Sequence, residues 1–303
     1  MKPIIFYHKN CADGFGAAFA AWKHFGADAE YIAVQYGDVK EVADLLNIAP
    51  VEGRDVYILD FSFPHDVMIH ITVSAAYTTW LDHHKTAFEM WVPEVRFMSP
   101  SYHYQTDDVM TIKLDNTKSG AMIAWEHFHG NNYWPMLIQH IDDYDRWVFK
   151  YADTKPFNKA LWSLTPWTFE QWDVLIKDTA SPRDPTYMMF IAMGDALLRD
   201  HSARVTKHVN KPRRCVVGAQ SGLAINAPGY VSSDAGHELA IASGTYGMTY
   251  TIDDTLMVKC SMRSNGDYDV SALAKAYGGG GHKNAAGFEC SIPQLLSILD
   301  YQV

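Results

Sequence analysis

Residues 77–84 read Tyr77-Thr78-Thr79-Trp80-Leu81-Asp82-His83-His84, an apolar run that ends in one acid and two imidazoles. Two earlier runs end in a similar way, because residues 3–8 finish at His8 and residues 55–60 finish at Asp60. Such β-like runs, separated by helix-like stretches, are typical of a parallel sheet in which the carboxyl ends of the strands share one edge. The sequence therefore predicts that these polar side chains meet at that edge.

The rest of the chain fits an α/β protein. In the first 150 residues the apolar patterns predict strands at 3–8, 30–35, 55–60 and 76–81. Helices are expected between them, and then at 119–129, 134–141 and 186–209. After Pro212 the pattern changes to short strands with a helix between them. We therefore expect a parallel-sheet domain at 1–180, a helical linker at 181–213 and a smaller α/β domain at 214–303.

Composition limits the partners of the protein. The chain has 303 residues and a formal net charge of −10, which disfavours a protein that grips long duplex nucleic acid through many phosphate contacts. No apolar window approaches the length of a membrane span, and the apolar N-terminal stretch is too short for a signal peptide. We expect a cytoplasmic protein with no membrane contact.

Four tryptophans fall in the segment 144–175, and two interpretations stay open. Trp147, Trp162, Trp167 and Trp172 could form an aromatic wall on which nucleobases stack. Alternatively they pack against the first domain and close its core, which we favour because loosely spaced aromatic residues are usually buried.

The polar residues at the predicted element ends suit a pair of divalent cations. A two-metal hydrolase needs carboxylates and imidazoles that hold two cations about 3.5–4 Å apart. This set of residue types is supplied by His8, Asp13, Asp60, His83 and Asp143. Each has an ordinary alternative when taken alone, since Asp13 could cap a helix and Asp60 could close a turn. Their joint occurrence indicates a metal site.

The ordered motifs resemble the DHH phosphoesterase superfamily. Asp82-His83-His84 matches the motif that names the family, and Arg263-Ser264 with Gly278-Gly279-Gly280-Gly281-His282 resembles its DHH-associated domain. The resemblance implies a metal-binding domain, a linker and a smaller domain, with the active site in the cleft between them. It also implies hydrolysis of phosphoric esters by a metal-activated water, with two Mn²⁺ ions or with Mg²⁺ or another divalent cation.

The resemblance also implies roles for individual residues. Asp60 is expected to bridge the two metals, and His8 to bind the first of them. The expected ligands of the second metal are Asp13, His83 and Asp143, with Asp145 as a further candidate. His84 is expected to face the substrate phosphate as a catalytic residue, with Asp82 orienting an imidazole. The expected substrate-binding residues are Arg263, Ser264, Gly280, Gly281, His282 and Asn284.

Cys11 departs from the pattern of the resembled family. That family usually carries Asp-x-Asp where this chain has Cys11-Ala12-Asp13. A thiolate suits manganese and magnesium poorly. Either the first metal is bound weakly, or it is a softer ion, or Cys11 itself is a ligand. The other cysteines, Cys215, Cys260 and Cys290, are too widely spaced to indicate a structural zinc site or a disulfide framework.

The resemblance, together with the acidic net charge, implies a phosphodiesterase or phosphatase that acts on short oligonucleotides or small nucleotides. Expected substrates include very short RNA, bisphosphorylated nucleotides and cyclic dinucleotides. One rival is a non-catalytic or weakly catalytic nucleotide sensor, and another is a single-strand exonuclease. Homodimer formation is left open.

Overall fold

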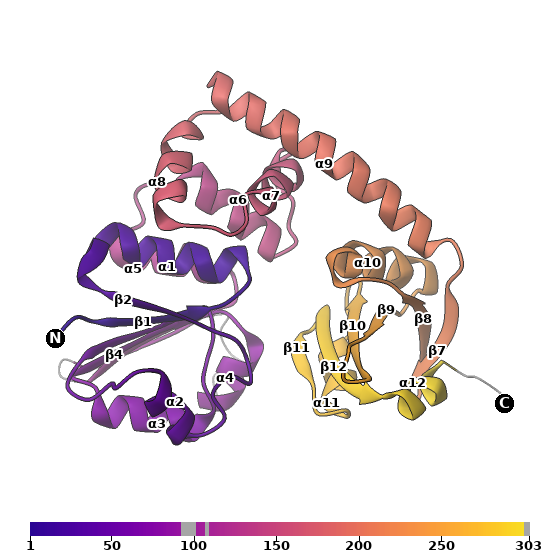
Figure 1. The fold of residues 1–303 in the computed structure, drawn as a ribbon, viewed down its shortest axis with the longest axis horizontal. Helices are drawn as coiled ribbons and strands as arrows, with labels where there is room; N and C mark the ends of the chain where they lie inside the picture. The colour runs from indigo at the N-terminus through magenta and orange to yellow at the C-terminus, as the bar shows by residue number, and fades with distance from the viewer. Residues whose placement is uncertain (92–100, 107–108, 300–303) are drawn as a thin grey trace. The chain divides into compact units, whose positions relative to one another are not determined.

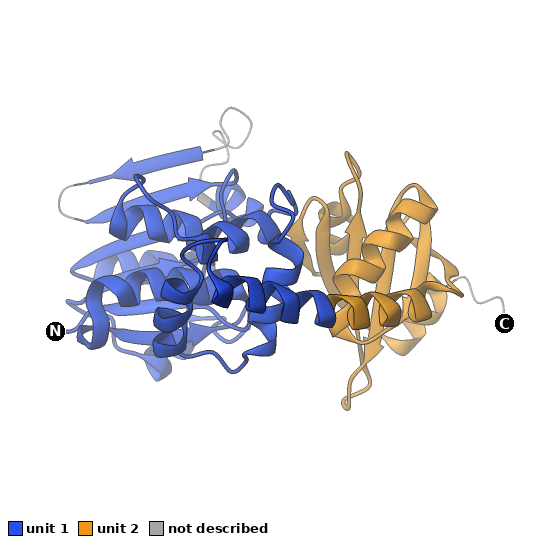
Figure 2. Ribbon diagram, turned by 90° about the horizontal axis from the view of Figure 1, so that it is seen from above, with its two compact units in different colours: residues 1–197 blue, residues 198–303 orange. Residues whose placement is uncertain are grey.

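The computed structural model describes residues 1–91, 101–106 and 109–299, which form two compact units (Figure 1). Unit 1 comprises Met1–Leu197 and unit 2 comprises Leu198–Val303 (Figure 2). The long helix α9, Pro185–Val209, contains the division between them. Among the described helices, none combines the length and the apolar character that crossing a membrane requires.

Unit 1 is built on a six-stranded sheet in the order β2-β1-β3-β4-β6-β5. Its strands are β1 (Ile4–His8), β2 (Glu30–Val34), β3 (Asp55–Leu59), β4 (Tyr77–Asp82), β5 (Ser101–Gln105) and β6 (Met110–Asp115). These strands pair in parallel except β5, which runs antiparallel to β6 at the edge. The α/β class and the parallel sheet predicted from the sequence are confirmed.

Helices cover both faces of this sheet (Figure 1). On one face lie α1 (Ala12–Phe25) and α5 (Gly120–His129), packed over Ile5, Leu59 and Leu81. The other face carries α2 (Val42–Ile48), α3 (His65–Ser74) and α4 (Lys85–Trp91), packed over the alternate strand residues, such as Phe6 and Trp80. Each large apolar side chain buried in this way contributes about 1.5–3 kcal/mol to folding. Burial on both faces holds the strand ends, and hence the polar residues there, in fixed positions.

Three further helices of unit 1 contain most of the tryptophan-rich segment. They are α6 (Met136–Asp145), α7 (Thr154–Ser163) and α8 (Phe169–Asp178). Trp172 is fully buried, with its ring centroid 4.8 Å from that of Phe15 on α1. Trp167 lies against both of these residues, at 5.6 Å from each. For these tryptophans the packing interpretation therefore holds, whereas Trp162 stays 41% exposed.

Unit 2 is a six-stranded mixed sheet in the order β11-β12-β10-β9-β8-β7. Its strands are β7 (Arg213–Val217), β8 (Gln220–Asn226), β9 (Tyr246–Ile252), β10 (Met257–Ser264), β11 (Gly280–His282) and β12 (Ala285–Ser291). Among these described strands, only β8 and β9 pair in parallel. The helices are α10 (Ser232–Ser243), α11 (Val270–Lys275) and α12 (Ile292–Ile298), and short 3₁₀ turns occur at Gly26–Asp28 and Gly229–Val231.

Candidate metal centre

The polar strand ends of unit 1 converge as the βαβ pattern predicts. His8 ends β1, Asp82 ends β4, and Asp60 follows the last residue of β3. The backbone N–H of Asp60 donates to Leu81 O at 2.9 Å, which ties this residue to the neighbouring strand. Asp60 has φ +62°, a left-handed conformation that aspartate tolerates better than most residues. The chain thus turns at Asp60 and leaves its carboxylate, 1% exposed, at the sheet edge.

The two oxygens of Asp60 face two different groups of side chains. Oδ2 lies 3.6 Å from His8 Nδ1 and 3.5 Å from Cys11 Sγ, and these two atoms are 3.3 Å apart. Oδ1 lies 3.1 Å from His83 Nε2. A carboxylate with one oxygen turned to each group has the geometry needed to bridge two cations.

The second group consists of His83 and two further acids. His83 Nε2 lies 3.5 Å from Asp13 Oδ2 and 3.7 Å from Asp145 Oδ2. The Asp13 carboxylate, 3% exposed, also accepts backbone hydrogen bonds from Gly120 at 2.7 Å and Ala121 at 2.8 Å, at the N-terminus of α5. Asp13 therefore joins the start of α1 to the start of α5 and still faces His83.

Asp143, which the sequence predicted as a ligand, is not brought to this group. Its carboxylate accepts hydrogen bonds from Lys150 N at 2.8 Å, Tyr151 N at 3.2 Å and Thr154 Oγ1 at 2.5 Å. Asp143 and Asp145 are two positions apart on α6, so their side chains point about 200° apart around the helix axis. The end of the helix can present only one of the two acids to His83, and the structure presents Asp145.

Asp82 and His84 form a pair beside these candidate metal ligands. Asp82 is fully buried, and its Oδ1 accepts from the backbone N–H groups of His83 at 2.7 Å and His84 at 3.1 Å. The same oxygen lies 2.7 Å from His84 Nδ1. This contact fixes the ring orientation of His84 and favours a proton on Nδ1.

Close packing of charged groups shifts several pKa values in the centre. Burial raises the pKa of Asp13, and the charges of Asp60 and Asp145 raise it further. Burial also raises the pKa of Asp60, but the imidazoles of His8 and His83 outweigh this effect and hold it well below the usual value. The pKa of His83 lies well above its usual value because Asp145, Asp60 and Asp13 outweigh the effect of burial. Three carboxylates around one imidazole leave net negative charge to be compensated.

Two glycines of the centre escaped the sequence analysis. A Cβ atom on Gly120 would lie 2.4 Å from Asp60 Oδ1, and one on Gly14 would lie 2.2 Å from His8 O. The start of α5 therefore presses on the Asp60 carboxylate, and the start of α1 presses on the end of β1. The only sequence signal was the position of each glycine at a predicted helix start, which does not reveal the neighbour across the fold.

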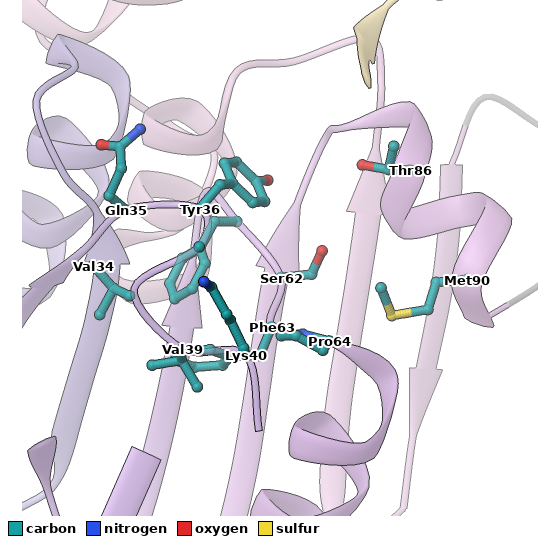
Figure 3. A pocket seen from close by; sticks show the side chains of 12 residues that line it. Val34, Gln35, Tyr36, Val39, Lys40, Ser62, Phe63, Pro64, Thr86 and Met90 are labelled. Atoms are coloured by element: carbon teal, nitrogen blue, oxygen red, sulfur yellow. The ribbon is translucent and has the colours of Figure 1, made fainter. Parts of the chain in front are cut away.

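Beside the centre, unit 1 contains a hollow with a volume of about 410 Å³ (Figure 3). Its lining is mostly apolar and includes Val39, Phe63 and Met90, with Lys40 as a cation. Tyr36 also lines it, with its ring centroid 5.3 Å from that of His8 and 6.1 Å from that of His84. Tyr36 thus lies both in the hollow and beside the candidate ligand His8, a position that the sequence analysis did not identify.

The predicted substrate-binding residues all lie in unit 2. The Arg263 guanidinium donates to Ser233 Oγ at 2.7 Å and to Met262 O at 2.9 Å. Ser264 and Asn284 hold a turn instead, since Ser264 Oγ donates to Tyr268 O at 2.6 Å and Asn284 Nδ2 donates to Gly266 O at 3.0 Å. Gly280, Gly281 and His282 form the short strand β11.

Comparison with known proteins places this architecture in a family. The DHHA1 domain model matches residues 220–302, which lie in unit 2. Oligoribonuclease NrnB of Bacillus subtilis is 25% identical over 300 residues, covering 94% of this chain and 72% of that protein. The chain belongs to the DHH phosphoesterase superfamily. Its DHH motif is Asp82-His83-His84, and its DHH-associated domain lies in unit 2.

Two further similarities agree with this placement. An uncharacterized protein of Acanthamoeba polyphaga mimivirus is 26% identical over 314 residues, covering 95% of this chain and 67% of that protein. The solved DHH domain of a member of a ribosomal protein family has the same fold. It gives a TM-score of 0.56 at 13% identity and covers 94% of this chain and 82% of that one.

As a member of this superfamily the chain is a phosphoester hydrolase, a class that depends on divalent metal ions. The centre fits such ions. The buried Asp60 Oδ1 lies 3.1 Å from His83 Nε2, but among the described residues no group donates a well-aligned hydrogen bond to it. Buried acceptors without donors are costly, and a cation beside them removes that cost. The groupings His8-Cys11-Asp60 and Asp13-Asp60-His83 each bring their ligand atoms within 4.8 Å of one another.

Proposed function

We propose that this protein is a two-metal phosphodiesterase that hydrolyses short oligonucleotides or small nucleotides. The observation that carries the proposal is the Asp60 carboxylate, whose two oxygens face His8 at 3.6 Å and His83 at 3.1 Å. In this proposal His8 and Asp60 hold the first cation, while Asp13, Asp60, His83 and Asp145 hold the second. The second set is rich in carboxylate oxygen, which suits Mn²⁺ or Mg²⁺.

Two bound cations would supply Lewis acidity, lowering the pKa of a water and neutralising charge on the phosphoryl group. The protein's own contribution centres on His84. Its Nδ1 is held by Asp82 at 2.7 Å, so the ring has a fixed orientation beside the metal ligands. The contact with Asp82 also raises the pKa of His84 against the opposing effect of burial. A protonated imidazole in this position can donate a proton to the leaving oxygen of the ester.

The hollow beside the centre supports a nucleotide as the substrate. Aromatic and aliphatic side chains, together with Lys40, suit a planar base that is attached to an anionic backbone. Tyr36 stands between the hollow and His84, at the position where a base next to the reacting phosphate could stack. The net charge of −10 further favours short substrates over long ones. The similarity to an oligoribonuclease agrees with this choice.

The test is a substrate panel with purified protein and Mn²⁺. The panel contains a 5′-phosphorylated dinucleotide, a longer single-stranded RNA, a cyclic dinucleotide and 3′,5′-bisphosphorylated adenosine. We expect the dinucleotide to be cleaved at least about tenfold faster than the longer RNA, with Asp60→Asn inactive on every substrate. Tight nucleotide binding without any cleavage would instead identify a sensor. Faster cleavage of the longer RNA would identify a single-strand exonuclease.

A further inference from the structure

Three donor atoms of different chemistry meet at the first metal position. They are His8 Nδ1, Cys11 Sγ and Asp60 Oδ2, separated by 3.3 Å (N to S), 3.5 Å (S to O) and 3.6 Å (N to O). Zinc lies about 2.3 Å from sulfur and about 2.0–2.2 Å from nitrogen and carboxylate oxygen, so tetrahedral angles place such donors about 3.4–3.6 Å apart. The observed triangle agrees with that size within a few tenths of an ångström.

The fold holds the sulfur in this triangle. Asn10 has φ +63° and turns the chain sharply after β1, so that Cys11 becomes the N-cap of α1. Cys11 Sγ accepts a hydrogen bond from Gly14 N at 3.1 Å. Because Gly14 has no side chain, the helix starts directly against His8 O. Burial and the charges of Asp60 and Asp13 raise the pKa of the Cys11 thiol well above its usual value. The thiolate is the form of cysteine that binds metals, and a cation bound in the triangle would stabilise it.

We infer that Cys11 is a thiolate ligand of the first metal, which makes this position selective for a softer cation such as Zn²⁺ or Co²⁺. One imidazole, one thiolate and one carboxylate with a remaining open position match the pattern of three protein ligands found in catalytic zinc sites. The second position has one imidazole and three carboxylates, which suit harder ions. The inference rests on the proposed two-metal function and deepens it: the two positions differ in the metal that they select. The buried Asp60 carboxylate connects the two positions, with Oδ2 facing the first and Oδ1 the second.

The decisive experiment reads the metal ligands directly. The apo-protein is loaded with one equivalent of Zn²⁺ and studied by X-ray absorption at the zinc edge, and in parallel with Co²⁺ by optical absorption. We expect one sulfur neighbour at about 2.3 Å beside nitrogen and oxygen at about 2.0–2.2 Å. The Co²⁺ form should show a near-ultraviolet charge-transfer band from sulfur to metal.

Two variants separate ligation from a packing role. Cys11→Ser keeps an acceptor for Gly14 N, so the helix cap and the melting temperature should be retained while the sulfur neighbour and the charge-transfer band disappear. Cys290→Ser removes a buried thiol of unit 2 and is the matched control, in which both signals should persist. Cys11→Asp should shift the ratio of Zn²⁺ to Mn²⁺ affinity toward Mn²⁺ by at least about tenfold.

The possible failures are distinguishable. A zinc environment of nitrogen and oxygen alone in the wild-type protein, or an unchanged spectrum in Cys11→Ser, would overturn the thiolate ligand and leave the proposed hydrolysis intact. A sulfur-bound metal in a protein that cleaves no phosphoric ester would support the ligand and overturn the proposed function.

Discussion

The two acids at the end of α6 should respond in opposite ways to the same substitution. Asp145→Asn removes a carboxylate that faces His83 Nε2 at 3.7 Å and whose side chain is 34% exposed. We therefore expect the folding stability to change by less than about 1 kcal/mol. Affinity for the second cation should fall at least about tenfold, and turnover at least about 100-fold, or about 2.7 kcal/mol.

Asp143→Asn should instead destabilise the fold and spare the metal centre. Asp143 accepts three hydrogen bonds, and a bond to a charged acceptor contributes about 1.5–3 kcal/mol. Asparagine keeps a single oxygen and turns an amide NH₂ toward the remaining donors, so one or two of these bonds are lost. The free energy of unfolding should fall by about 2–4 kcal/mol, with the segment 146–154 loosened most.

Three measurements on both variants decide the matter. Denaturant unfolding in the presence of a chelator gives the stability of the metal-free protein. Electron paramagnetic resonance counts free Mn²⁺ during a titration and gives its affinity, and hydrolysis of a dinucleotide gives turnover. Loss of Mn²⁺ binding at unchanged stability in Asp143→Asn, with full activity in Asp145→Asn, would show that Asp143 rather than Asp145 is the ligand.

Three other residues offer sharp tests. Gly120→Ala places a methyl group 2.4 Å from Asp60 Oδ1, so the carboxylate must shift and Mn²⁺ affinity should fall at least about tenfold. Gly229→Ala, at a position with open space around it, is the control and should leave that affinity unchanged. Burial lowers the pKa of His140 to about 4, so the unfolded chain takes up the proton first as the pH falls. In the wild type, this residue therefore lowers the free energy of unfolding by up to about 3 kcal/mol as the pH falls from about 6.5 to about 4. His140→Gln lacks this titration, so its free energy of unfolding should fall less between pH 7 and pH 4.5. Denaturant unfolding at both pH values measures the difference. Arg263→Ala should raise KM about 10- to 100-fold at unchanged metal content, since a charge-assisted phosphate contact contributes about 1.5–3 kcal/mol; an unchanged KM would remove Arg263 from substrate binding.

Sequence periodicity could predict the sheet and most of the centre. The predicted strands end at or near His8, Asp60 and Asp82, and parallel strands place their carboxyl ends at one edge, so these side chains must lie close together. The sequence could not decide whether Asp143 or Asp145 faces His83. It depends on the rotation of α6 about its axis and on the loop that returns to Thr154, and both are set by tertiary packing.

Other features depend on contacts across the fold that local pattern does not encode. Gly120 touches Asp60, and Tyr36 lies beside His84, although each pair is far apart in the sequence. In unit 2, the strand β11 within the glycine-rich motif was not predicted, and neither was the use of Ser264 and Asn284 as hydrogen-bond donors to a turn. Polar residues near a motif can hydrogen-bond to the backbone as readily as to a substrate, and only the three-dimensional structure distinguishes these two roles.

Asp13 both faces His83 and accepts two backbone hydrogen bonds, which should affect how this position changes in evolution. Both of its oxygens hold the start of α5, 107 and 108 positions away in the sequence, so a chain that lost Asp13 would lose a structural tie as well as a ligand. Among the described hydrogen bonds, Asp145 accepts none from the backbone, so its substitution should leave the fold intact. A descendant that abandons catalysis should therefore discard Asp145 early and retain Asp13 long afterwards. The order of loss among degenerate relatives would record which acids serve chemistry alone.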